Sequence, residues 1–302
     1  MHPNSEPRLR ILHLNTNGIT SKNNYIEWES LLDMLDEYQT DIYCLNEINV
    51  DTQQSKVQYD LRERAKRQDK HTHLSMNSSK QLPATINSIF KSEGTMMGTR
   101  GNWSGRVINI QNDPAKDKLG RWTATHIRGV KDTILTIISV YQVCSGGGTG
   151  DNTAYLQQQT YLYKERGRHL DPRNAICKDL RKVLQHLNEC KHKIIICADI
   201  NDDVGHEFQN QWNSVMEEAG MQHIIQTMHD HRALPRTYDR GKRCLDTIMI
   251  SDNIENDSLL RSGILPFYSV TVSDHRAMYL DIDTTKTAAG ISRRCILFKV
   301  LY

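Results

Sequence analysis

The stretch KIIICADIND, residues 193–202, decides the fold. Its continuous apolar run has the length of a strand and is typical of a central strand that is buried in a core. The run stops at Asp199 and Asn201, so polar side chains lie where this strand leaves the core.

Other segments of strand length recur on both sides of this stretch. They are RLRILHLN (8–15), DIYCLNE (41–47), GRVINIQ (105–111), RWTATHIR (121–128), TILTIISVY (133–141), CLDTIMIS (244–251) and AMYLDID (277–283). Apolar residues have helical spacing at 24–38, after Asp171 and Pro172, and at 207–220. For the polar residues 51–82 we expect a helix or an ordered loop. Strands with helices between some of them predict an α/β or α+β sandwich.

Composition describes a globular chain without a strong charge. Of the 302 residues, 38% are hydrophobic and 25% are charged, and the formal net charge is +2. This charge permits a nucleic-acid partner but does not demand one. We find no repeat and no linker, so we expect one domain over residues 1–283 and a loose tail over 284–302.

The sequence also predicts an intracellular protein, nuclear or cytoplasmic, that is neither secreted nor bound to a membrane. The N-terminus has no secretory apolar core, and the longest apolar runs are too short to span a bilayer. The seven cysteines are scattered and include no CxxC pair, which indicates reduced thiols and argues against a structural zinc site.

Polar side chains gather where the expected strands begin or end. Each has an ordinary explanation as a turn residue, a helix cap or a core residue. Together, however, they form a recurring pattern of the kind that builds ligand sites at strand ends. Oxygen donors in such a group suit Mg²⁺. The residues are Asn15, Asn17, Glu47, Tyr141, Asp199, Asn201, Asp246, Asp274 and His275.

Six short motifs resemble the successive motifs of the endonuclease/exonuclease/phosphatase superfamily. They are LNTNG (14–18), IYCLNE (42–47), ISVY (138–141), ICADIND (196–202), CLDTIMIS (244–251) and VSDHRAM (272–278). They keep the family's order and span residues 9–282. The segment TYDRGKRCLDTIMIS (237–251) is most similar to exonuclease III-like proteins and endonuclease domains of non-LTR retroelements. The resemblance implies a DNase I-like fold of four layers, in which two β-sheets are flanked by helices and the site lies at one end of the sheets.

The resemblance also implies a role for each residue at the metal side and at the attacking water. Glu47 is the implied main Mg²⁺ ligand, with Asn17 and Asp274 on the same side. Asp199 is implied to orient or deprotonate the attacking water. Asn201 is implied to hold that water or a phosphate oxygen.

The remaining roles concern the phosphate. Asn15 and Tyr141 are implied to contact it, and His275 to donate to a non-bridging oxygen as charge develops. Asp246 is implied to hold the ring of His275 and keep it protonated.

Two departures from the family pattern bear on specificity. Repair enzymes carry Pro-Asn after the ISVY motif, whereas this chain has Gln142, Val143 and Cys144, so one phosphate-contacting Asn is missing. Apurinic endonucleases carry an aromatic residue before the later Leu-Asp, whereas this chain has Arg243 and Cys244. These departures favour a less selective or structure-guided nuclease.

Arg121 and Trp122 are further candidates, for substrate binding by charge and stacking, with a structural role in a strand as the alternative. The expected function is that of a Mg²⁺-dependent phosphodiesterase, with Mn²⁺ as a substitute ion, that nicks DNA and derives from a retroelement. One alternative is a related phosphoesterase acting on inositol phosphates, phospholipids or RNA tails. Another is a non-catalytic binding module. The sequence leaves the choice of DNA or RNA, the cleavage site and the oligomeric state open.

Overall fold

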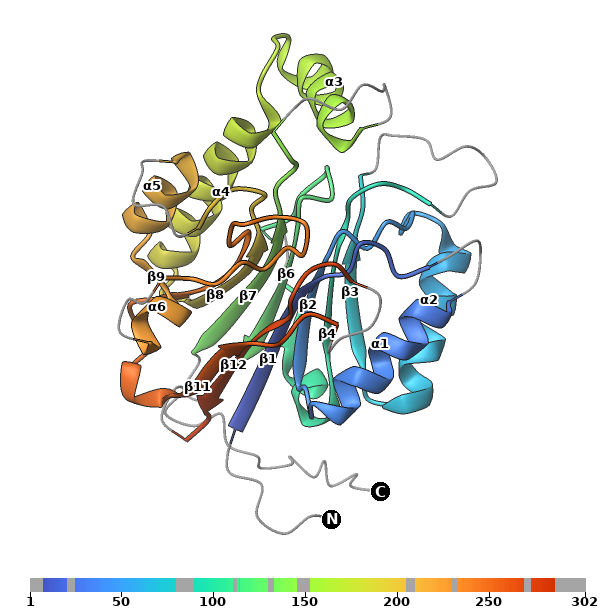
Figure 1. Cartoon of the computed structure of the whole chain (residues 1–302), viewed down its shortest axis with the longest axis vertical. Helices are drawn as coiled ribbons and strands as arrows, with labels where there is room; N and C mark the ends of the chain where they lie inside the picture. Colours follow the sequence, from blue (N-terminus) through green and yellow to red (C-terminus); the bar gives the residue numbers. More distant parts are fainter. Residues whose placement is uncertain are drawn as a thin grey trace, which may run out of the picture.

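Two β-sheets face each other in the centre of the molecule, and helices flank them on the outside (Figure 1). The computed structural model describes residues 8–20, 25–79, 90–110, 113, 115–129, 133–145, 153–204, 210–229, 233–268 and 273–285. Most of the expected C-terminal tail, residues 286–302, lies outside this part of the chain. The predicted four-layered sandwich is confirmed.

The first sheet has six strands in the order β11–β12–β1–β2–β4–β3. Strand β1 pairs in parallel with β2 and antiparallel with β12, so the sheet is mixed. The strand bounds are β1 Arg8–Asn15, β2 Ile42–Asn46, β3 His73–Asn77, β4 Thr95–Thr99, β11 Leu259–Ile264 and β12 Met278–Asp283.

The second sheet also has six strands, in the order β5–β6–β7–β8–β10–β9. Here β7 and β8 are the parallel pair, and β10 lies antiparallel to β8. The predicted antiparallel run over residues 105–141 is confirmed, since β5 pairs with β6 and β6 with β7 in that manner. The strand bounds are β5 Val107–Ile108, β6 Trp122–Arg128, β7 Ile134–Tyr141, β8 Lys193–Asp199, β9 Met221–His223 and β10 Asp246–Ser251.

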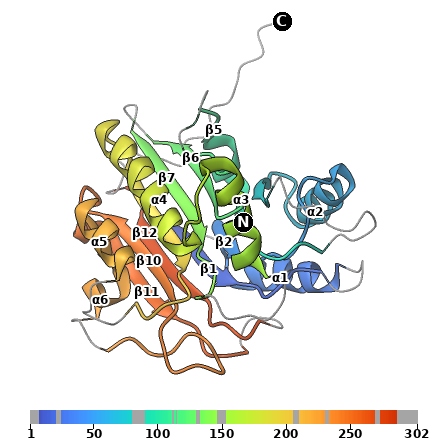
Figure 2. The same ribbon diagram turned by 90° about the horizontal axis from the view of Figure 1, so that it is seen from above.

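The helices cover the two outer faces. Helices α1 and α2 lie beside the first sheet, and α4 and α5 beside the second, as the view from above also shows (Figure 2). Helix α4 begins as predicted, because the Asp171 carboxylate accepts from the backbone N of Arg173 at 2.8 Å and Pro172 occupies the first turn. No helix in the described ranges is long and apolar enough to cross a membrane. The bounds are α1 Ile26–Glu37, α2 Ser55–Gln68, α3 Ala154–Arg166, α4 Pro172–Glu189, α5 Gln211–Glu218 and α6 Ile224–Met228, with 3₁₀ turns at Gly101–Arg106 and Asn256–Ser258.

Three apolar layers hold the sandwich together, one between the sheets and one under each set of helices. Side chains along a strand point alternately to its two faces. In β1, Leu9 and Ile11 therefore belong to the layer between the sheets, whereas Leu12 and Leu14 pack toward the helices. The same alternation places His13 and Asn15 on the face between the sheets.

Several short elements were not predicted, among them β3, β4, β9, β11, α3 and α6. Strand β4 shows the reason. Its sequence, TMMGT, carries a glycine that is unfavourable in strands. However, a Cβ on Gly98 would lie 1.9 Å from Cζ of the buried Tyr43 ring on β2. The neighbouring strand therefore requires this glycine, and local propensity does not reveal that requirement.

Candidate active site

The predicted residues meet at one end of the two sheets because of strand direction. The parallel pairs β1–β2 and β7–β8 bring Asn15, Glu47, Tyr141 and Asp199 to the same end. Strand β10 runs the opposite way, and its first residue, Asp246, pairs with Asp199, the last residue of β8.

Residue alternation then turns these side chains toward one another. In β8, Ile195 and Cys197 lie in the layer between the sheets, and Asp199 continues the same face. Asn15 continues the face of Ile11 in β1 in the same way. The end of the layer between the sheets is thus polar where the rest of it is apolar, and Asn15, Asp199 and Asp246 are all buried there.

The backbone is left-handed where three of these strands end. Asn17, Glu47 and Asn201 have φ values of 49°, 52° and 46°. A non-glycine residue in this region costs of order 1–3 kcal/mol, and such residues concentrate at functional sites. The turns after β1, β2 and β8 therefore hold strained backbone beside the predicted residues.

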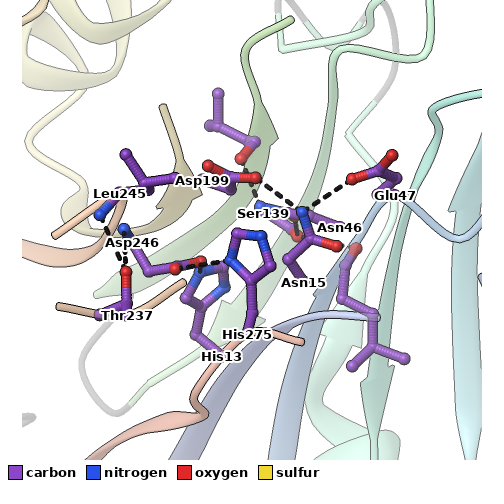
Figure 3. A network of polar contacts seen from close by, with 12 residues as sticks. His13, Asn15, Asn46, Glu47, Ser139, Asp199, Thr237, Leu245, Asp246 and His275 are labelled. Carbon is purple, nitrogen blue, oxygen red and sulfur yellow. Dashed lines mark hydrogen bonds and ion pairs between the residues drawn. The ribbon is translucent and has the colours of Figure 1, made fainter. Parts of the chain in front are cut away.

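Asn15 joins the two halves of the site. Its Nδ2 donates to Oε2 of Glu47 at 2.9 Å and to Oδ2 of Asp199 at 2.7 Å (Figure 3). Its Oδ1 accepts from the backbone N of Asn17 at 2.9 Å. The carboxamide of Asn15 therefore bridges Glu47 of the first sheet and Asp199 of the second sheet.

Asp199 is a buried acid whose pKa is far above its usual value. Burial, and next the charge of Asp246, raise its pKa to about 7. The backbone N of Asn201 donates to Oδ1 of Asp199 at 2.9 Å, and Nδ2 of Asn201 donates to Oδ2 at 3.3 Å. Near neutral pH this carboxylate can therefore both accept and release a proton.

His275 has the opposite environment. Its Nδ1 lies 2.9 Å from Oδ2 of Asp246 (Figure 3). Burial alone would disfavour the imidazolium, but the charge and hydrogen bond of Asp246 prevail and raise the pKa of His275 to about 10. The pKa of Asp246 lies well below its usual range for the same reason, against the effect of its own burial. The pair is thus an ion pair at neutral pH.

Asp199 and the ion pair are close together. One ligand-type atom from each of Asp199, Asp246 and His275 lies within 4.8 Å of the other two. Within this group, His275 and Asp246 already bond each other.

Glu47 and Asp274 form the side of the site that suits a cation. Glu47 is half-buried, and burial is the main cause of its raised pKa. The hydrogen bond from Asn15 and the charge of His275 counteract this shift, while the charge of Asp274 adds to it. A divalent cation would relieve the repulsion between the two carboxylates, and the donors here are oxygens, as Mg²⁺ prefers. Asn17 is exposed in the adjoining turn, where its backbone N donates to Oδ1 of Asn15.

Of the remaining predicted residues, Tyr141 lies beside the site, whereas Arg121 and Trp122 form structural contacts. Tyr141 is buried beside the site, and burial and the charges of Glu47 and Asp199 raise its pKa. Arg121 and Trp122 are also buried. Arg121 forms ion pairs with Asp117 and Asp179, and the Trp122 indole donates to the carbonyl of Ala115 at 2.7 Å. These contacts give both residues a structural role, and their role in substrate binding stays a prediction.

The structure also describes the residues at which the chain departs from the family pattern. Nε2 of Gln142 donates to the carbonyl of Ile200 at 2.8 Å. Sγ of Cys144 lies 3.0 Å from Oδ1 of Asn201, so a thiol contacts the turn after β8. Cys244 is buried, whereas Arg243 is exposed.

Five contributing residues were not predicted. Nε2 of His13 lies 3.2 Å from Oδ1 of Asp246. The backbone amides of Leu245 and Asp246 donate to Oγ1 of Thr237, and Ser273 accepts from the backbone N of His275. Ser139 and Asn46 bond each other between the sheets at 2.7 Å. The alternation in β1 was the available signal for His13, because it shares a face with Asn15.

The fold is found in several solved structures. An AP endonuclease from Leishmania major matches with a TM-score of 0.66 and 13% sequence identity over 91% of this chain and 88% of that chain. The endonuclease domain of the telomere-specific non-LTR retrotransposon TRAS1 matches with a TM-score of 0.55 and 11% identity over 93% and 100%. The endonuclease/exonuclease/phosphatase protein of Beutenbergia cavernae matches with a TM-score of 0.58 and 14% identity over 91% and 71%.

No protein-family model matches the chain, and no curated protein matches it. At these identities the likeness to solved structures concerns the fold. Strand order, the two flanked sheets and the structures that share them lead to one conclusion: this chain has the fold of the endonuclease/exonuclease/phosphatase superfamily.

Proposed function

We propose that the chain is a metal-dependent phosphodiesterase that nicks DNA. The observation that carries this proposal is that Asp199 and the His275–Asp246 pair lie close together, with ligand-type atoms of all three residues within 4.8 Å of one another. Asp199 has a pKa raised to about 7, and His275 is held as a cation by Asp246. In-line attack on a phosphodiester needs a base for the water and a donor for the oxygens that gain charge.

The residues then act in a definite order. Asp199 accepts a proton from a water held by Asn201, and the water oxygen attacks phosphorus. His275 donates a hydrogen bond to a non-bridging oxygen as that oxygen gains charge, while Tyr141 contacts the phosphate and Asn15 holds Glu47 and Asp199 in place. The bond from phosphorus to the leaving sugar oxygen breaks, that oxygen takes up a proton from solvent water, and Asp199 then releases its proton to solvent. A general base whose pKa lies near the working pH is the efficient choice for this reaction.

Glu47, Asn17 and Asp274 are the residues that would hold Mg²⁺, or Mn²⁺ in its place. Such a cation, when bound, supplies charge neutralisation to the phosphate. The environment of Glu47 supports this placement, because burial first and the charge of Asp274 in addition disfavour its charged form, and a bound cation would favour that form.

The surroundings of the site support a polyanionic substrate. Arg240 lies 3.5 Å from Asp274, and its side chain is 74% exposed. Lys242 and Arg243 are exposed in the same loop. Basic residues beside the site attract a nucleic-acid backbone without reading its sequence. An AP endonuclease and a retrotransposon endonuclease domain share the fold, which adds support for a nuclease and for an origin in a retroelement.

The test compares substrates of three classes. Supercoiled plasmid, single-stranded RNA and a water-soluble inositol phosphate are incubated with the protein and Mg²⁺, and again with a chelator. We expect nicked circular plasmid with Mg²⁺ only, and none from the Asp199→Asn variant purified in parallel. Phosphate release from the inositol phosphate with an intact plasmid would reassign the substrate. No turnover of any of the three would indicate a binding module.

A further inference from the structure

We infer that His13 is a positioning residue that holds Asp246, and through it His275, in the orientation needed for turnover. This inference rests on the proposed function, in which His275 donates to the phosphate. It concerns a residue outside the six motifs that resemble the superfamily. The LNTNG motif begins at residue 14, directly after His13.

The geometry makes Asp246 a shared acceptor. Its Oδ2 faces Nδ1 of His275 at 2.9 Å, and its Oδ1 faces Nε2 of His13 at 3.2 Å. Figure 3 shows the two imidazole rings on the same carboxylate. Neither His13 nor Asp246 is exposed to solvent. With both oxygens occupied by rigid rings, rotation of the carboxylate would break one hydrogen bond or the other.

The hydrogen bonds also determine which nitrogen of His13 carries the proton. Asp246 is an acceptor, so Nε2 of His13 must be the donor. Among the residues that the structure describes, none forms a hydrogen bond with the buried Nδ1 of His13. A second proton there would be a buried donor without an acceptor, which is costly. The structure therefore assigns a proton to Nε2 of His13, where it faces Asp246.

The contact also joins the two sheets. His13 lies on β1 in the first sheet and Asp246 on β10 in the second, and 233 positions separate them in the sequence. The loop that carries His275 leads into β12, which neighbours β1. His13 thus fixes the acid of the second sheet relative to the donor that the first sheet carries.

The first test compares His13→Phe with His13→Gln. Phe keeps the size of the ring but cannot donate, whereas Nε2 of Gln can donate to Asp246 from nearly the same place. We expect His13→Phe to lower kcat for plasmid nicking on the order of tenfold to a hundredfold with little change in KM, as loss of an orienting group does elsewhere. His13→Gln should recover most of that loss. In an Asp246→Asn background, His13→Phe should add little.

The matched control is His126→Phe. His126 is equally buried, and its ring bonds Thr136 and Asp113. His126 pairs with Thr136, which lies five residues before Tyr141, the end of β7 at the active site. At about 3.3 Å per strand residue, His126 is about 17 Å from that end. We expect this variant to lower the melting temperature without lowering kcat. If both Phe variants lower kcat in proportion to their loss of stability, His13 is only a core residue.

A second readout does not need activity. Protein labelled with ¹⁵N-histidine should show a proton on Nε2 of His13, in a hydrogen bond to Asp246. The ring signals of His275 should shift in His13→Phe and stay in place in His126→Phe. A His13 ring without a proton on Nε2, or unchanged His275 signals, would overturn the inference even if the wild type nicks plasmid. If the wild type cuts no substrate, the proposed function fails, and these spectra still decide whether His13 holds Asp246.

Discussion

Nδ1 of His275 lies 2.9 Å from Oδ2 of Asp246, and both side chains are buried at the end of the sheets. The contact turns a histidine into a lasting cation, because the carboxylate overcomes the cost of burying the charge. The loop before β12 supplies the ring and β10 supplies the acid, so the two sheets must pack correctly before the pair exists.

The pair should behave as a unit in turnover. His275→Ala should lower kcat on the order of a hundredfold or more, as loss of one preorganised donor does elsewhere. Asp246→Asn should lower it too, and the double variant should be little worse than His275→Ala. A double-mutant cycle on plasmid nicking at saturating Mg²⁺ measures this, with the exposed His71→Ala as control. Strictly additive losses would show that the two residues act separately.

The rate should depend on pH through two groups. Asp199 must be ionised to accept a proton, so the rate should rise as the pH passes through about 7. His275 must be protonated, so the rate should fall only as the pH approaches about 10. Asp246→Asn removes the charge that favours the cation and should move this alkaline limb to lower pH. Profiles of kcat/KM at saturating Mg²⁺ test both limbs, and an unmoved alkaline limb in the variant contradicts the assignment.

Asp199→Asn should abolish turnover and leave substrate binding nearly unchanged. The change keeps the shape and most hydrogen bonds but removes the base, which acts in the transition state rather than in the ground state. Single-turnover nicking and fluorescence anisotropy with a labelled DNA duplex give the two quantities. A fall in affinity equal to the fall in rate would make Asp199 a binding or structural residue.

Glu47→Gln should weaken the dependence on the cation without unfolding the chain. The amide can still accept from Nδ2 of Asn15, but it no longer carries the charge that attracts a divalent ion. We expect the Mg²⁺ concentration for half-maximal nicking to rise about tenfold or more, in proportion to the charge lost. The exposed Glu37→Gln is the control. Wild-type activity at limiting Mg²⁺ would exclude Glu47 as the main ligand.

Glu93 should make the fold less stable at alkaline pH. It is buried, Gln158 donates to it, and burial raises its pKa to about 8 from 4.5. The folded state therefore keeps this proton to a higher pH than the unfolded state, so the group's contribution to stability is largest below about 4.5 and is lost as the pH rises to about 8.

Glu93→Gln removes this titration. From pH 5 to pH 9 the free energy of unfolding of the variant should gain at least about 1 kcal/mol relative to the wild type. Urea unfolding at the two pH values measures the difference. Parallel pH dependence of the two proteins would show that Glu93 is not protonated in the folded state.

The sequence by itself determined which residues lie where strands begin and end. Alternation and apolar runs predicted β1, β7, β8 and β10 with their polar ends, because these properties are local to each strand. The order of the six motifs then indicated the two flanked sheets. Asp199, Asp246 and His275 could therefore be named before any of their contacts was known.

Only the tertiary structure decided which of these groups touch and how their proton affinities differ. The bond from Asn15 to Asp199 spans 184 positions and that from His13 to Asp246 spans 233. No local pattern contains such pairs, so the sequence did not single out His13, and for Arg121 it left substrate binding and a structural role both open. A pKa depends on burial and on charges that packing brings near. The same carboxylate chemistry thus has a raised pKa in Asp199 and a lowered pKa in Asp246, because the two sheets surround them differently.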